Sequence, residues 1–270
     1  AVGNSVATPT TATDTAIVDL TAPDNTAIVT AVQILADANG VTPNEANGDG
    51  FINNSEYDNA TVVAGNKVTE VLVTLADTVA EGDVVSYTIN NGTAVEHSVT
   101  TAEAAAHAFT ILDVQIPADG DTLTVNAAVI KDAVGNSVAT PTTATDTAIV
   151  DLTAPNNQPV VDANTTTPTP DVLYTLDSSP VITGTVSQAL AIGEVLQVTI
   201  GGATYELVPD ATTLVWTLDT GTTNPITGSP TFTPLTSGNN SVVAKVIDQA
   251  GNSITDTTND EVVVLAQVTN

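Results

Sequence analysis

The sequence predicts an all-β protein built from tandem β-sandwich domains. The first observation is that Thr and Val dominate the chain, because these β-branched residues suit a pleated, half-buried backbone. The second is that apolar and polar residues alternate in short runs such as 71–75 and 195–200. The third is that turn signals such as Asn91-Gly92 separate these runs at the intervals of a sandwich.

The alternating runs form two similar sets of expected strands. The first set lies near 25–35, 67–76, 83–90, 93–99, 108–116, 121–131 and 144–152. The second lies near 172–176, 180–187, 194–201, 203–208, 213–218, 239–248 and 260–268. Only residues 101–107 read as a helix, and Trp216 is expected to fill a core. Seven strands in about 115–130 residues fit an immunoglobulin-like sandwich.

An exact internal repeat sets the expected domain boundaries. Residues 1–23 and 133–155 are identical, at an offset of 132 residues, which indicates tandem duplication. We therefore expect residues 1–23 to be the C-terminal remnant of a preceding repeat, 24–155 to be one full repeat, and 156–270 to be a second, diverged domain. The natural chain is expected to continue N-terminally. Identical copies are typical of spacers and polyvalent binders rather than of catalytic chains.

Composition excludes several functional classes. With 31 acidic residues, 3 lysines and a net charge of -28, the chain is not expected to bind nucleic acid. No apolar run is long enough for a membrane span, and the 42% hydrophobic content argues against disorder. There is no cysteine, and His97 and His107 accompany no catalytic motif, so we do not expect an enzyme. A salty habitat is an alternative explanation of the acidic excess.

Residues 45–56 match a twelve-residue calcium loop of the EF-hand type. Oxygen ligands fall at positions 1, 3, 5, 9 and 12, the carbonyl ligand at position 7, and Gly50 at position 6. These candidate ligands are Glu45, Asn47, Asp49, Phe51, Asn53 and Glu56, with Asp37 and Asn39 just upstream. Because the flanks do not read as helices, we expect a calcium loop between two strands rather than a full EF-hand. The alternative is a solvated acidic loop.

Acidic and amide residues also gather at the expected domain boundaries. The candidate ligands there are Asp19, Asp24, Asp132, Asn136, Asp151, Asp248 and Asp260. Carboxylates placed where two domains abut repel each other, and a divalent cation converts that repulsion into a clamp. The alternative is that each Asp caps a turn or faces water.

Three strings carry a resemblance to a known family. D-A-V-G-N at 132–136, V-D-L-T-A-P at 150–155 and N-G-D-G-F-I-N at 47–53 resemble the bacterial immunoglobulin-like repeats of giant repeats-in-toxin (RTX) adhesins. The resemblance covers essentially the whole chain. It implies an extender made rigid by calcium at its linkers, with Asp132, Asp151 and the 45–56 loop as ligands. The chain departs from that pattern at Asn156-Asn157, where the first copy has Asp24-Asn25, and at an insertion over 40–46.

The sequence therefore predicts tandem immunoglobulin-like domains joined by short calcium-binding linkers. The expected function is a structural extender of a secreted, cell-surface adhesin that projects a distal ligand-binding region. Its expected partners are calcium ions and neighbouring repeats of the same chain; we expect a monomer without membrane insertion. The alternative is a module that binds sugar, ice or a host surface. Exposed Tyr174, Tyr205 and Trp216 would favour that alternative, and their burial would count against it.

Overall fold

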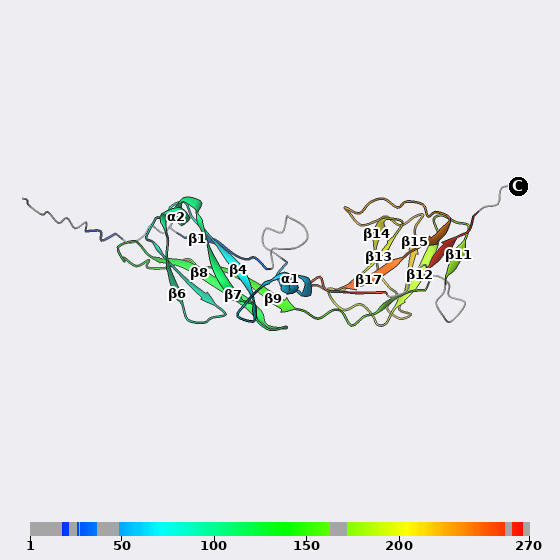
Figure 1. The fold of residues 1–270 in the computed structure, drawn as a ribbon, viewed down its shortest axis with the longest axis horizontal. Coiled ribbons are helices and arrows are strands. Elements are labelled where there is room, and N and C mark those ends of the chain that lie inside the picture. Colours follow the sequence, from blue (N-terminus) through cyan, green and yellow to red (C-terminus); the bar gives the residue numbers. More distant parts are fainter. Residues whose placement is uncertain are drawn as a thin grey trace, which may run out of the picture. The chain divides into compact units, whose positions relative to one another are not determined.

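The chain is built almost entirely of β-strands, which confirms the all-β prediction (Figure 1). The computed structural model describes residues 18–21, 26, 28–36, 49–162, 172–256 and 261–266. Within these ranges, nineteen strands form five sheets, and two short helices interrupt them. Most paired strands run antiparallel, as expected for hairpin-connected β-sandwiches.

The first nine strands form two sheets. They are β1 (Val29–Ile34), β2 (Phe51–Asn53), β3 (Thr61–Val63), β4 (Asn66–Leu75), β5 (Val84–Ile89), β6 (Val95–Ser98), β7 (Ala108–Gln115), β8 (Thr122–Lys131) and β9 (Ala144–Asp151). One sheet has the order β1-β4-β3, with β7 paired to β4, and the other has the order β2-β9-β8-β5-β6. All seven strands expected in this region are present. The sequence reading missed β2 and β3, which have only three residues each and show little alternation.

The other ten strands form three sheets. They are β10 (Pro159–Val161), β11 (Leu173–Thr175), β12 (Val181–Val186), β13 (Val195–Ile200), β14 (Ala203–Leu207), β15 (Val215–Asp219), β16 (Gly238–Asn240), β17 (Val243–Ile247), β18 (Ser253–Thr255) and β19 (Val262–Val264). Their sheet orders are β10-β12-β15, β11-β19-β16 and β14-β13-β17-β18.

One expected strand was wrong. Residues 239–248 form two strands, because β16 pairs with β19 whereas β17 pairs with β13 and β18. Between them, the backbone N–H of Val242 donates to the Glu261 carboxylate at 3.1 Å instead of to a neighbouring strand. The break lets the chain pass from one sheet to another. The three-residue strands β10 and β18 were not anticipated.

Contacts divide the chain into two compact units. The first comprises Ala1–Val32, Leu72–Thr110 and Val125–Asp146, and the second comprises Gln33–Val71, Ile111–Thr124 and Thr147–Asn270. The second unit therefore contains β2, β3 and all strands from β10 onward. These limits differ from the repeat boundaries expected from the sequence, which follow the duplication and not the contacts.

The second unit has a large apolar core around Trp216, which is 1% exposed, as the sequence predicted. The Trp216 indole N–H donates to the Thr185 carbonyl at 3.2 Å, so its single polar group is satisfied. Gly184 lies opposite Trp216 in the β12–β15 pair. A Cβ atom at Gly184 would overlap the indole, which explains the glycine in the middle of this strand.

The two helices are α1 (Asn54–Asn59) and α2 (Thr101–Ala106). Helix α2 confirms the predicted helical segment. Helix α1 contradicts the expectation that the flanks of the acidic loop are not helical, because it begins directly after β2. Its cause is a capping box in which Asn53 and Glu56 satisfy each other's backbone N–H groups.

Candidate functional site

A hydrogen-bonded turn at Asp132–Asn136 holds the end of the repeated Asp-Leu-Thr segment. The Asp132 carboxylate accepts from the Asn136 backbone at 2.8 Å and from the Asn136 side-chain amide at 2.7 Å. The same amide donates to the carbonyls of Thr21 at 2.9 Å and Asp19 at 3.3 Å. Asp19 in turn accepts from the Thr21 N–H at 2.9 Å. The Asn136 side chain thus joins the turn to a segment more than one hundred residues earlier in the sequence.

The turn at Asp248–Asn252 repeats this arrangement in the second unit. The Asp248 carboxylate accepts from the Asn252 backbone at 2.9 Å and from its side-chain amide at 3.3 Å. That amide also donates to the Asp151 carbonyl at 2.9 Å. Asp151 accepts from the Thr153 N–H at 3.1 Å, as Asp19 does from Thr21. The diverged domain has therefore kept the turn and the contact that it makes.

Asp119 fixes the strand end that this second turn contacts. Its carboxylate accepts from the Leu152 N–H at 2.8 Å and from the Thr153 hydroxyl at 2.9 Å. These bonds, with the Leu152 bond contributing most, lower the Asp119 pKa, so its charged form is favoured. Asp119 is not among the site residues predicted from the sequence, because nothing local indicates partners more than thirty residues away.

The described part of the acidic loop, residues 49–56, leads into helix α1. The Asp49 carboxylate accepts from the Phe51 N–H at 2.9 Å, and the Asn53 amide oxygen accepts from the Glu56 N–H at 3.1 Å. The Glu56 carboxylate accepts from the Asn53 N–H at 2.9 Å. Positions 9 and 12 of the proposed calcium loop are therefore also the cap of α1. The expected loop between two strands is corrected to a strand, β2, followed by a helix.

The loop and the second turn meet in the second unit. Strand β2 pairs in parallel with β9, and Asn53 lies opposite Asp151. One residue further on, the Asn54 N–H donates to the Asn252 side-chain oxygen at 2.8 Å. Asn53 and Asn54 also line a cavity of about 310 Å³ together with Leu152, Ala154 and residues 251–253.

The structure separates the predicted site residues into three sets. The first set lies at the first turn: Asp19, Asp132 and Asn136. The second set lies at the second turn: Asp151, Asp248 and Asn53. Asp49, Phe51 and Glu56 belong to the loop that leads into it. The remaining candidates lie outside the described residues: Asp24, Asp37, Asn39, Glu45, Asn47 and Asp260.

The two turns differ in their electrostatics. Burial raises the Asp248 pKa and the nearby Asp151 charge adds to the rise, although hydrogen bonds from Asn252 oppose it. Desolvation favours a higher Asp132 pKa as well. Hydrogen bonds from Asn136, Val134 and Gly135 outweigh this effect, so the Asp132 pKa is lowered overall. The second turn therefore holds a carboxylate that repels a neighbouring carboxylate, whereas the Asp132 carboxylate is stabilised where it lies.

The oxygen atoms at the second turn are chemically suited to a hard divalent cation. In the described part of the chain, His, Cys, Asp and Glu side chains form no group of three or more that could hold a metal. A cation here would take the Asp151 and Asp248 carboxylates and complete its shell with amide, carbonyl or water oxygens, as Ca²⁺ does. The mutual repulsion that contributes to the raised Asp248 pKa is the feature that such an ion would relieve.

The chain that follows Asp151 is firmly held. Asn157 is fully buried, and its side-chain amide donates to the Gln188 carbonyl at 3.0 Å and to the Glu194 carboxylate at 3.3 Å. Its side-chain oxygen accepts from the Gln188 N–H at 3.2 Å. Pro155 and Pro159 are buried on either side. Asn156, the residue that departs from the repeat, is exposed, so the departure does not affect this anchor.

Sequence reasoning missed Asn54 and Asn157 as site residues and did not include Asn252 among the metal ligands. The signal for Asn252 was present, since it occupies the same place after Asp248 that Asn136 occupies after Asp132. The signal for α1 was the Asn-x-x-Glu capping box, which coincides with positions 9 and 12 of the calcium loop. Nothing local marks Asn157, because its partners lie about thirty residues away.

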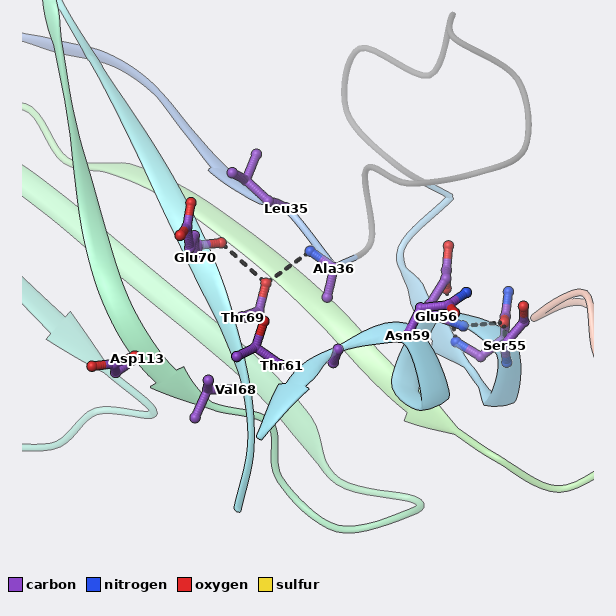
Figure 2. Close-up of a pocket in the computed structure, with 12 residues that line it drawn as sticks. Leu35, Ala36, Ser55, Glu56, Asn59, Thr61, Val68, Thr69, Glu70 and Asp113 are labelled. Atoms are coloured by element: carbon purple, nitrogen blue, oxygen red, sulfur yellow. Dashed lines mark hydrogen bonds between the residues drawn. The ribbon is translucent and has the colours of Figure 1, made fainter. Parts of the chain in front are cut away.

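A second cavity, of about 370 Å³, lies beside α1 (Figure 2). At its rim, the Thr69 hydroxyl accepts from the Ala36 N–H at 2.8 Å and donates to the Glu70 carbonyl at 3.1 Å. None of its twelve lining residues is aromatic. The aromatic platform considered for ligand binding is not formed either, because Tyr205 and Trp216 are buried and only Tyr174, at 65%, is exposed.

Comparisons with known proteins yield structures but no family. No protein-family model matches, and no curated protein matches. A solved structure of a tetra-tandem repeat in the extending region of a large adhesion protein is similar at 22% identity and a TM-score of 0.23; the match covers 71% of this chain and 44% of that one. The surface glycan-binding protein SGBP-B of the Bacteroides ovatus mixed-linkage glucan utilization locus, in complex with a heptasaccharide, is similar at 14% identity and the same TM-score; the match covers 86% and 47%.

This chain therefore spans less than half the length of either structure. At such TM-scores the likenesses establish no family and no function. In the described residues, no helix has the length and apolar character needed to cross a membrane.

Proposed function

We propose that the chain is a segment of the extender of a secreted, cell-surface adhesin, in which calcium fixes the joints between successive β-sandwich repeats. The observation that carries the proposal is the repeated turn. Asn136 binds the end of one Asp-Leu-Thr segment and Asn252 contacts the end of its exact copy. A contact that recurs with the repeat is what a chain of stacked modules requires, because each module then meets the next in the same way.

Calcium supplies the positive charge that the second turn lacks. Asp151 and Asp248 repel each other, and Lys67, Lys131 and Lys245 are the only cationic residues other than histidine in a chain of net charge -28. Bound Ca²⁺ would replace this repulsion with shared coordination at the point where the Asp248 turn meets the Asp151 strand end. We assign Asp49, Asn53, Glu56 and the Phe51 carbonyl to a second calcium position in the acidic loop.

The affinity expected of such sites places the protein outside the cell. Extracellular calcium modules bind with dissociation constants of about 0.1–1 mM, which cytosolic calcium does not reach. The extender would thus be loosely jointed before secretion and stiff after it. Its binding partners in this account are calcium and the neighbouring repeats, and the chain itself is a monomer that carries no catalytic site.

Thermal unfolding tests the proposal. In 10 mM CaCl₂ the free energy of unfolding should exceed that in EGTA by about 1.4–2.7 kcal/mol, because calcium at about ten to one hundred times its dissociation constant binds only the folded form. For a chain of this size, that corresponds to a rise of about 3–10 °C in the unfolding midpoint. MgCl₂ at the same concentration should give a much smaller rise. Equal midpoints in calcium and in EGTA would refute the calcium role.

A further inference from the structure

The two histidines of the chain lie at opposite ends of helix α2, in the first unit. His97, in β6, lies near the start of the helix, and its Nε2 atom is 3.0 Å from the Glu103 carboxylate. His107 is the C-cap residue, and its Nδ1 atom is 3.8 Å from the Asp77 carboxylate, which is too long for a hydrogen bond. Of these two described rings, only that of His97 is hydrogen-bonded to a carboxylate.

The Glu103 carboxylate caps the helix as well as binding His97. The oxygen that contacts His97 also accepts from the Thr100 backbone N–H at 2.8 Å and from the Thr100 hydroxyl at 3.0 Å. Burial acts to raise the Glu103 pKa, but the hydrogen bonds from Thr100 and His97 outweigh this effect and lower the pKa. The carboxylate therefore stays ionised over the range, about pH 5 to 8, in which histidine side chains gain a proton.

The His97 ring also contacts the apolar core. It stacks on Phe109 in β7, with the ring centroids 4.2 Å apart and an angle of 17° between the ring planes. Phe109 is buried, whereas the His97 side chain is 31% exposed, so solvent protons reach the imidazole. Strand β6 belongs to one sheet, whereas β7 pairs with β4 of the other. His97 thus contacts both the start of the helix and a strand of the opposite sheet.

The surroundings of His97 contain little competing charge. Glu96 precedes it and so lies on the other face of β6, where its carboxylate binds the Lys131 ammonium at 2.7 Å. Val85, which lies opposite His97 in β5, and Phe109 are apolar. Among these described neighbours in β5, α2 and β7, Glu103 alone carries a charge. The interaction of a protonated His97 is therefore mainly an attraction to Glu103.

We propose that His97 and Glu103 form a pH-sensitive ion pair that holds α2 more firmly against β6 at about pH 5.5 than at about pH 8. A neutral imidazole donates to Glu103 only with its proton on Nε2, and that bond lacks charge assistance on the donor side. The imidazolium donates from both nitrogens, and its positive ring lies over the negative face of Phe109. The gain needs the proton on His97, so it is present in mild acid and lost as pH rises. This response to acidity does not depend on the calcium role proposed above.

Hydrogen exchange of the whole chain, followed by NMR in EGTA, tests the proposal. The Glu103 and Ala104 amides donate to Thr100, and their exchange is expressed as protection relative to an unstructured peptide at the same pH. From pH 8 to pH 5.5 this protection should rise about two- to fivefold, the range of partly exposed ion pairs. His97→Gln keeps a neutral donor and should abolish the rise. His107→Asn is the matched control at the other end of α2, where Asn tolerates the left-handed backbone, and it should keep the rise.

A second variant keeps the test decisive if His97→Gln does not fold. Glu103→Gln retains a side chain suited to the capping box but carries no charge, so protection of α2 should then not rise in mild acid. A full rise in either folded variant overturns the proposal, as does the absence of a rise in the wild type. A rise that is lost in His107→Asn and kept in His97→Gln assigns the response to the other end of the helix and also overturns it. Because EGTA is present throughout, none of these outcomes affects the calcium proposal.

Discussion

The two turns share their central hydrogen bonds but shift the pKa of their Asp residue in opposite directions. In each, an Asp carboxylate accepts from the backbone and side chain of an Asn four residues later, and that Asn donates to the backbone of an Asp-Leu-Thr segment. The Asp132 pKa is lowered, whereas burial and the Asp151 charge raise the Asp248 pKa. The same type of turn therefore occurs with two different electrostatic environments around its Asp carboxylate.

The difference shows where our proposal places a cation. Hydrogen bonds from Asn136, Val134 and Gly135 favour the ionised form of the Asp132 carboxylate. The Asp248 carboxylate is instead raised in pKa by burial and by the Asp151 charge, so a bound Ca²⁺ would supply a counter-charge there.

The largest expected effect comes from neutralising Asp248 and Asp132 in separate variants. In EGTA at pH 7, Asp248→Asn should raise the unfolding midpoint, because it removes a buried charge that Asp151 repels. It should also remove most of the stabilisation that calcium gives, about 1.4–2.7 kcal/mol at 10 mM. Asp132→Asn should lower the midpoint in EGTA, because its ionised form is the favoured one. Opposite signs in the two variants, measured by calorimetry, support the comparison.

The pH dependence sharpens the same contrast. A raised pKa in the folded state means that the folded chain binds more protons, so the Asp248 contribution falls as pH rises from about 3.8 through its raised value. The lowered Asp132 pKa acts in reverse, and its contribution is lost as pH falls below about 3.8. Urea unfolding in EGTA from pH 3 to 7 should show the wild type losing stability relative to Asp248→Asn as pH rises. A constant difference would contradict the proposed repulsion.

A smaller effect distinguishes the two helix caps. Asn53 and Thr100 both form capping boxes, with Glu56 and Glu103 respectively. Replacing either by Ala should reduce stability by about 1 kcal/mol. Only Asn53→Ala should also speed exchange of the Asn54 backbone amide, because that N–H directly follows Asn53 and donates to the Asn252 side-chain oxygen. Exchange measured by NMR at Asn54 separates the two variants, and equal exchange at Asn54 in both would show that the α1 cap does not affect the contact with the turn.

The sequence predicted the strands better than the contacts between distant residues. Regular alternation revealed the long strands such as β4 and β8, but the three-residue strands are too short to show a period. Helix α1 was missed because its capping box overlaps the calcium-loop pattern, so one pair of residues fits two interpretations. The repeat singled out Asp132, Asn136 and Asp248, and the structure places them in the two hydrogen-bonded turns. The contacts of Asn252 with Asp151 and Asn54 join residues that are far apart in the sequence, so no local pattern could predict them.

The central claim is that calcium fixes the joint between successive repeats. Small-angle X-ray scattering of the whole chain, in 5 mM calcium and again in EGTA, tests it most directly. The account predicts a narrow, well-defined maximum dimension with calcium and a broader, larger distribution of distances without it, since unpaired carboxylates then loosen the joint. Superimposable scattering curves in the two conditions would contradict the claim and leave Asp151 and Asp248 as ordinary acidic residues.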